Sequence, residues 1–225
     1  CDMLHEAEPE VKIYASTWGY VPEWLGKLDV WGIGVQGQIS EENLKKLRDS
    51  GAQLLITTDG HMCLDTPYNA IERMLPLFAW KYGTRGYEFW GADWLTRNPF
   101  EWGIHAVHTQ SDVPGKPQRI RYPNGDGYIF YPGKPIGIRG PVSTVRLESL
   151  RDGIEDGSYY LLLERLANEK NDAPAKALLD RAKQFAPIPN AGGRNSEKLL
   201  PDPDVLTKLR NEIGEAISRL CEVEY

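Results

Sequence analysis

The sequence predicts an α/β fold with four parallel strands, followed by a hairpin insertion and a helical C-terminal region. Short runs of β-forming residues alternate with helical segments from about Val11 to Trp90, which favours a parallel sheet with crossover helices. A stretch rich in Pro, Gly, Asn and Asp then runs from about Thr96 to Gly140, and apolar residues recur at helical spacing beyond Pro141. The alternation fits an open doubly wound sheet as well as one half of a TIM-like (β/α)8 barrel.

The four strands are predicted from local composition. Each is a short run of β-branched, aromatic or other apolar residues bounded by polar or turn-forming residues. The third run is almost continuously apolar, as expected of a strand that is buried on both faces of its sheet. The runs are Val11–Ser16, Asp29–Val35, Gln53–Thr58 and Gly86–Trp90.

Two helices are predicted between these strands. Ser40 can cap the first helix, which stops at Gly51, since glycine is the residue that most often ends a helix. Thr66–Pro67 opens the second helix, which Pro76 can kink and Gly83 ends. Strands joined by helices in this way form βαβ units, the building blocks of a parallel sheet.

The insertion is predicted to contain a hairpin. Asn124–Gly127 is a strong turn signal, and it lies between two β-rich runs at residues 119–122 and 128–131. We expect residues 1–140 to form a half-barrel with the insertion and its site loops, and residues 141–225 to form helices packed on the barrel.

Three amphipathic helices are predicted in the C-terminal region. Gly153 and Gly157 lie inside the first of them, where each costs about 1 kcal/mol relative to alanine, so we expect another backbone to pack closely there. Arg151 and Glu155 lie one helical turn apart and can pair. The three helices are predicted from apolar positions at Leu147, Leu150, Ile154 and Leu161, from residues 174–185, and from Leu206, Leu209, Ile213, Ile217 and Leu220.

Composition excludes several classes of function. The chain has 225 residues, a net charge of −6 and no basic stripe, which argues against a nucleic-acid binder. No apolar stretch approaches the roughly 20 residues that span a membrane. The cysteines Cys1, Cys63 and Cys221 are odd in number and widely spaced, which argues against a disulfide scaffold and a zinc site. No glycine pattern indicates a phosphate-binding cofactor, so none is expected.

Aromatic and polar residues gather where the predicted strands end. All seven tryptophans fall within the first 102 residues. In a parallel sheet the ligand lies at the carboxyl ends of the strands, and indole faces beside carboxylates and amides suit a sugar ring with its hydroxyls. The alternative is that an individual tryptophan fills the core. The expected substrate-binding residues are Trp18, Gln36, Asp59, His61, Trp90, Asp93 and Trp94.

Two of these residues are weak catalytic candidates. Asp59 and Asp93 could form an acid/base pair of the kind that glycoside hydrolysis requires. Structural roles are at least as favoured, because Asp59 opens a turn dipeptide and Asp93 can cap the next segment. Glu88 is a further weak candidate, since strand alternation decides which face of the sheet it occupies. His105 and His108 lie three residues apart, but no third ligand supports a metal site.

Several motifs of the chain, between about Val11 and Leu166, carry a family resemblance. The most specific are Tyr131-Pro132-Gly133 and the run from Arg151 to Asp156. The other matching segments are Thr57–Gly60, Tyr87–Gly91, Asn124–Tyr128, Gly140–Ser143 and Arg146–Leu150. Together they resemble the domain of unknown function 4091, which is similar to the catalytic domain of glycoside hydrolase family 123. The resemblance implies a TIM-like (β/α)8 barrel of which this chain is the C-terminal half.

The resemblance also implies an activity. Enzymes of this family are retaining, substrate-assisted N-acetyl-β-galactosaminidases that use a neighbouring aspartate and glutamate. No Asp-Glu dipeptide occurs in this chain, so the pair is expected upstream of Cys1 and no catalytic role is transferred. The chain alone is expected to be inactive, and a non-catalytic carbohydrate-binding or assembly module is the alternative. Expected partners are a saccharide, with N-acetylgalactosamine one candidate, and the N-terminal half of the barrel or a second copy. The compartment stays open, with an extracellular or periplasmic location one option.

Overall fold

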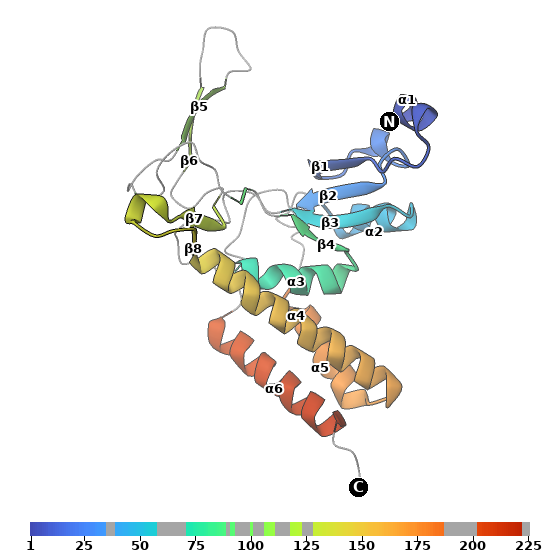
Figure 1. The fold of residues 1–225 in the computed structure, drawn as a ribbon. Helices are drawn as coiled ribbons and strands as arrows, with labels where there is room; N and C mark the ends of the chain where they lie inside the picture. Colours follow the sequence, from blue (N-terminus) through green and yellow to red (C-terminus); the bar gives the residue numbers. More distant parts are fainter. Residues whose placement is uncertain are drawn as a thin grey trace.

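The protein is described by a computed structural model, in which the elements follow one another in layers (Figure 1). A parallel sheet lies at one end, two long helices cross beneath it, and two further helices complete the opposite end. The structure describes residues 1–34, 39–57, 71–88, 91–92, 100, 106–110, 118–122, 128–186 and 202–221, but not the side chains of Trp18, Ile71 and strands 106–110 and 118–122.

The sheet confirms the predicted parallel arrangement. Its four strands lie in the order β1-β2-β3-β4, and each is parallel to its neighbour. Short strands joined through helices keep the same direction, so their carboxyl ends meet at one edge. The strands are β1 (Tyr14–Trp18), β2 (Val30–Gly34), β3 (Gln53–Thr57) and β4 (Gly86–Glu88).

The two faces of the sheet differ in chemistry. Trp31, Ile33 and Ile56 are buried and join one core cluster with residues of α2 (Glu41–Asp49) and α3 (Ile71–Tyr82). Because side chains alternate along a strand, the neighbours of these residues point to the other face. On that face Thr57 is buried and Leu55 is only partly buried, so the prediction that this strand is buried on both faces is confirmed in part.

The predicted helix ends are confirmed where they are described. The Ser40 hydroxyl accepts a hydrogen bond from the Asn43 backbone N–H at 3.2 Å and caps α2. Gly51 and Gly83 have φ values of +81° and +65°, which glycine adopts without steric cost. Pro76 lies inside α3, as expected. The chain begins with a short helix, α1 (Asp2–Ala7), and a 3-10 turn follows β1 at Pro22–Trp24.

Helix α4 (Val145–Glu169) packs against α3 through its two glycines. A Cβ atom at Gly153 would lie 2.4 Å from the backbone oxygen of Arg73, and one at Gly157 would lie 3.0 Å from Cβ of Pro76. The close backbone approach predicted at these positions is therefore confirmed at Gly153, whereas Gly157 meets the side chain of Pro76. It allows α4 to cross directly beneath α3, as Figure 1 shows.

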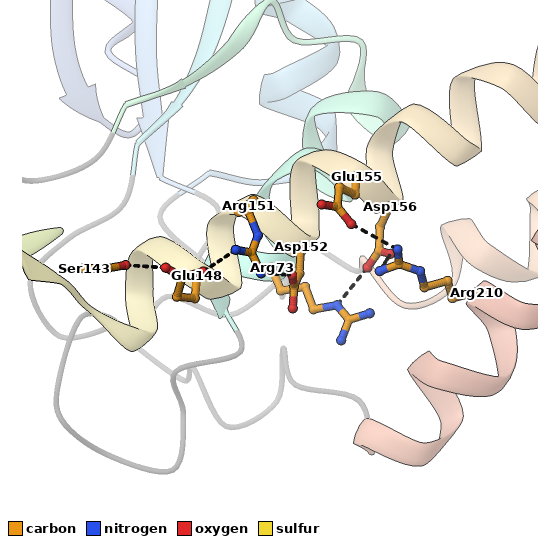
Figure 2. A network of polar contacts seen from close by, with 8 residues as sticks. All are labelled: Arg73, Ser143, Glu148, Arg151, Asp152, Glu155, Asp156 and Arg210. Carbon is orange, nitrogen blue, oxygen red and sulfur yellow. Dashed lines mark hydrogen bonds and ion pairs between the residues drawn. The ribbon is translucent and has the colours of Figure 1, made fainter.

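An ion-pair network surrounds this crossing (Figure 2). Asp156 of α4 is buried and pairs with Arg73 of α3 at 2.8 Å and with Arg210 of α6 (Pro203–Cys221) at 3.0 Å. Arg210 also contacts Glu155 at 3.2 Å. The predicted Arg151–Glu155 pair is wrong, because Glu155 turns towards α6 while Arg151 pairs with Glu148 at 2.6 Å.

Helices α5 (Ala173–Lys183) and α6 form the far layer with α4. The apolar stripe predicted for α6 is confirmed, with Leu206, Leu209, Ile213 and Leu220 buried and Ile217 partly buried. The stripe predicted for α4 is wrong in part, since Ile154 and Leu161 are 49% and 58% exposed. Helix α4 instead buries Leu150, Gly153, Gly157, Tyr160 and Leu163, because neighbours cover it on two sides.

The insertion contains two antiparallel pairs. Strand β5 (Ala106–Gln110) pairs with β6 (Gln118–Tyr122), and β7 (Phe130–Pro132) pairs with β8 (Pro141–Ser143). The predicted hairpin between residues 119–122 and 128–131 is therefore wrong, although both halves are largely extended. The turn signal at Asn124–Gly127 lies outside the described residues. A 3-10 turn at Lys134–Ile136 connects β7 to β8.

Glu72, in the first turn of α3, is the most deeply buried acid in the described part of the chain. Its side chain is 0% exposed, and its carboxyl oxygens have no hydrogen-bond partner among the described residues. Burial raises the pKa of Glu72 to about 8, because a charged carboxylate loses its hydration there, and the positive charge of Arg146 opposes the rise.

Glu72 makes stability depend on pH. Between the ordinary carboxyl pKa of 4.5 and about 8, the folded protein keeps a proton that the unfolded chain has lost. The free energy of unfolding should therefore fall as pH rises through this window, by up to about 1.4 kcal/mol per pH unit. Urea denaturation at a series of pH values measures this slope. The Glu72→Gln variant should flatten it, and an unchanged slope in that variant would contradict the assignment.

The helix crossing makes a second prediction. Gly153→Ala should destabilise the protein by about 2 kcal/mol, because overpacking against the Arg73 backbone outweighs the better helix propensity of alanine. Gly214→Ala in α6 is the matched control, since its Cβ would lie 3.5 Å from Cε1 of Tyr159, an ordinary contact. The control should be neutral or more stable by up to about 1 kcal/mol. Thermal unfolding measures both changes, and equal stabilities of the two variants would contradict the close crossing.

Candidate functional site

Three side-chain oxygens converge on the face of the sheet that α2 and α3 leave uncovered. The Thr57 hydroxyl, on the last residue of β3, donates a hydrogen bond to Oε2 of Glu88 at 3.3 Å. Glu88 is the last residue of β4, so both groups lie at the carboxyl ends of their strands. The hydroxyl of Tyr14 reaches the same place from β1.

Gly32 of β2 provides the space for this convergence. A Cβ atom at Gly32 would lie 2.7 Å from Oγ1 of Thr57, 2.9 Å from the hydroxyl oxygen of Tyr14 and 3.0 Å from Oε2 of Glu88. Any side chain at position 32 would displace all three oxygens. Each of the four strands therefore contributes to one cluster, which we call the inner-face cluster and define as Tyr14, Gly32, Thr57 and Glu88.

The inner-face cluster has the chemistry of a polar binding surface. Burial raises the pKa of Glu88 above its ordinary value. The protonated acid therefore persists to a higher pH and can donate as well as accept a hydrogen bond. Thr57 is buried, whereas the Tyr14 side chain is 44% exposed. Two hydroxyls and a carboxyl group on a partly open surface can bind a ligand that carries several hydroxyl groups.

The structure leaves most of the expected site residues undescribed. Trp18 is the last residue of β1, at the carboxyl end of the sheet as predicted, but its side chain is not described. None of the expected residues is therefore seen beside another. Those that lie outside the described residues are Gln36, Asp59, His61, Trp90, Asp93 and Trp94.

Two of the remaining tryptophans have structural roles. Trp31 is fully buried in the core. Trp80 of α3 stacks on Tyr160 of α4 with ring centroids 5.2 Å apart, and its indole N–H donates to Glu164 at 3.0 Å. For these two residues the core-filling alternative is correct.

Sequence reasoning singled out Glu88 but missed Tyr14, Gly32 and Thr57. The signal that could have identified these residues is the alternation of side chains between the two faces of paired strands. Apolar residues at Trp31, Ile33 and Ile56 assign one face of the sheet to the helices, so the residues at even positions of β2 and odd positions of β3 face the other way.

The described residues contain no group of three or more His, Cys, Asp or Glu side chains that could hold a metal ion. His108 lies in strand β5, so the helical spacing considered for His105 and His108 does not apply to it. No helix in the described ranges is both long enough and apolar enough to cross a membrane.

Comparison with known proteins agrees with this architecture. A solved structure of a family 123 glycoside hydrolase from Clostridium perfringens, reported for glycolipid glycan hydrolysis, superposes with a TM-score of 0.60 at 19% identity. The superposition covers 92% of this chain and 35% of that chain, so the present chain spans about a third of the enzyme's length. No curated protein matches the chain.

The sequence itself matches the family described as glycoside hydrolase 123, catalytic domain, over residues 2–163. This range contains the four-stranded sheet, the inner-face cluster, the crossing of α3 and α4 and most of α4. The likeness to the solved enzyme shows the same fold. The chain therefore belongs to the glycoside hydrolase family 123 catalytic domain family.

Proposed function

We propose that this chain supplies the C-terminal half of a glycoside hydrolase barrel and binds a saccharide at the carboxyl ends of its strands. The observation that carries the proposal is the inner-face cluster. Its hydroxyls and carboxyl group converge on the sheet face that faces away from the helices, which in a closed barrel is the interior. Active sites of such barrels lie at the carboxyl ends of the strands, where Thr57 and Glu88 are found.

The proposed substrate is an N-acetyl-β-galactosaminide. The family resemblance supports a retaining reaction in which the acetamido group of the sugar is the nucleophile. This mechanism needs a neighbouring aspartate and glutamate, and the chain has no Asp-Glu dipeptide. We therefore assign the catalytic pair to a part of the protein outside this sequence. Trp18, Trp90 and Trp94 would provide apolar walls for the ring, with Gln36, Asp59, His61 and Asp93 as hydrogen-bonding groups.

Hydrolysis of an aryl N-acetyl-β-galactosaminide by the full-length protein tests this proposal. We expect release of the aryl group from this substrate and not from the matching aryl β-galactoside, because the galactoside lacks the internal nucleophile. The chain of 225 residues alone should release none. Thr57→Val in the full-length protein should lower kcat/KM by about tenfold, the typical effect of losing one hydrogen bond of about 1.4 kcal/mol.

Other outcomes separate the alternatives. Saccharide binding without turnover would indicate that the protein is a carbohydrate-binding module and not an enzyme. Loss of turnover in both Asp59→Asn and Asp93→Asn, with release from the plain galactoside, would support those aspartates as the acid/base pair instead. Neither binding nor turnover with any galactoside would refute the proposal.

A complete barrel also requires a partner for this half. The outer edges of β1 and β4 have no neighbouring strand among the described residues. Beside β4, an apolar groove of about 310 Å³ has Pro76, Trp80, Tyr87, Ile154, Gly157 and Leu161 among its lining residues. We propose that the N-terminal half of the barrel covers this groove, and that a second copy covers it when the chain is produced alone.

Size measurement of the isolated chain tests this association. Light scattering should give a mass above the 25.4 kDa monomer. Replacing Ile154 and Leu161 together by glutamate should shift the mass towards the monomer, because two charges would then lie in the apolar contact. Ile138→Glu, at a 48% exposed position on the β7–β8 connection, is the matched control and should leave the mass unchanged. A wild-type chain that behaves as a stable monomer would contradict the proposal.

A further inference from the structure

Glu88 is the acidic side chain of the inner-face cluster, and the register of the sheet fixes its direction. It pairs with Thr57 of β3, and its neighbour Tyr87 pairs with Ile56. Ile56 is fully buried in the core, and Tyr87 packs against that core. Because side chains alternate along a strand, Glu88 points to the opposite face, which is the interior of a closed barrel. Glu88 also ends its strand, so it lies at the edge of the sheet where the sites of such barrels are found.

Two hydroxyl groups from other strands converge on the carboxyl group of Glu88. The Thr57 hydroxyl donates to Oε2 at 3.3 Å. The Tyr14 hydroxyl reaches the same point, since a Cβ atom at Gly32 would lie 2.9 Å from the hydroxyl oxygen and 3.0 Å from Oε2. A carboxylate can accept about four hydrogen bonds, so the bond from Thr57 does not exhaust its capacity. The cluster therefore holds the carboxyl group in one place and leaves it able to accept further hydrogen bonds.

Glutamate is an unfavourable choice for the stability of the sheet at this position. Burial raises the pKa of Glu88, because the carboxylate loses hydration there, so its charged form is destabilised. Glutamate is also depleted in strands, where β-branched residues such as Thr57 are favoured. Departures of this kind from the locally preferred residue are typical of functional sites, and more so at the carboxyl end of a barrel strand.

A fixed carboxylate suits the recognition of a sugar hydroxyl group. Hydrogen bonds with an ionised partner are shorter and stronger than those between neutral groups. A site that is built to hydrogen-bond one hydroxyl group rejects an analogue without it, because the acceptor then loses its partner. Thr57 and Tyr14 can bind hydroxyl groups only as neutral partners. Within the inner-face cluster, Glu88 is therefore the side chain that can discriminate most strongly between sugars.

We propose that Glu88 is a specificity-determining residue of the saccharide site, and that its carboxylate accepts a hydrogen bond from one ring hydroxyl group of the sugar. This inference rests on the proposed function. It deepens that proposal, because it assigns the recognition of a hydroxyl group to the inner face of the sheet and to a residue of this chain.

Binding of the free sugar to the full-length protein tests this role without turnover. Isothermal titration calorimetry measures the affinity of the wild type and of Glu88→Ala for N-acetylgalactosamine and for deoxy analogues that each lack one hydroxyl group. The wild type should bind one analogue about tenfold to a hundredfold more weakly than the parent sugar, the loss expected for one hydrogen bond to a charged group. Glu88→Ala should bind the parent sugar with a similar loss, and removal of the same hydroxyl group should then reduce the affinity no further.

Gln53→Ala is the matched control. Gln53 lies on the same face of the sheet as Thr57, but it is the first residue of β3, at the amino end of the strand. This variant should bind every sugar with wild-type affinity. If Glu88→Ala does not fold, Glu88→Gln takes its place, because the amide keeps the shape of the side chain and removes its charge. Its loss of affinity should be about threefold to tenfold and should depend on the same hydroxyl group.

The outcomes separate this inference from the proposed function. An equal loss of affinity for the parent sugar and every analogue in Glu88→Ala would overturn the role of Glu88 and leave the saccharide site in place. Wild-type affinities in Glu88→Ala with loss of hydrolysis would make Glu88 a catalytic group, and would also overturn the role in specificity. A wild-type protein that binds none of the sugars would refute the proposed function together with this inference.

Discussion

The contact between α4 and the backbone of α3 is the constraint on which the rest of the structure depends. At Gly153 there is no room for a single methyl group, so the two helix axes approach as closely as backbones allow. This approach brings Asp156 within reach of Arg73 and Arg210, which connects the sheet layer to the terminal helices. It also places the start of α4 beside the residues that lead into β7, where Arg146 and Thr144 donate hydrogen bonds to the backbone oxygens of Tyr128 and Ile129.

The core and the candidate site are two faces of the same strands. Alternation sends Trp31, Ile33 and Ile56 into the helical core and leaves Gly32, Thr57 and Glu88 on the opposite face. A one-residue slip of β2 or β3 would therefore destroy the core and the inner-face cluster together. Burial of the apolar side chains fixes the register of β2, β3 and β4. The same register sets where the polar groups of the inner-face cluster lie.

Local signals in the sequence identify the helices and strands. The strand or side chain that each of them contacts depends on the rest of the chain. The Ser40 cap, the glycines at 51 and 83 and the stripe of α6 could all be predicted, because each rests on residues within a few positions of one another. The partner of Glu155 could not, because Arg210 comes from α6, 55 residues further along the chain. The partner of β6 could not either, because a strand can pair with the strand before it as well as with the strand after it. The residues of the candidate site also differ in how far the sequence alone could identify them. Glu88 was a candidate by residue type, but its neighbours Tyr14 and Thr57 come from distant strands.

The motifs that carry the family resemblance have structural explanations in this chain. A Cβ atom at Gly133 would lie 2.3 Å from the backbone oxygen of Gly140, so the turn after Tyr131 requires glycine. In the motif on α4, Gly153 admits the Arg73 backbone and Asp156 binds two arginines. These residues maintain a packing arrangement and do not by themselves indicate chemistry. The family match therefore shows the fold, and the support for an activity comes from the side-chain oxygens that converge at Gly32.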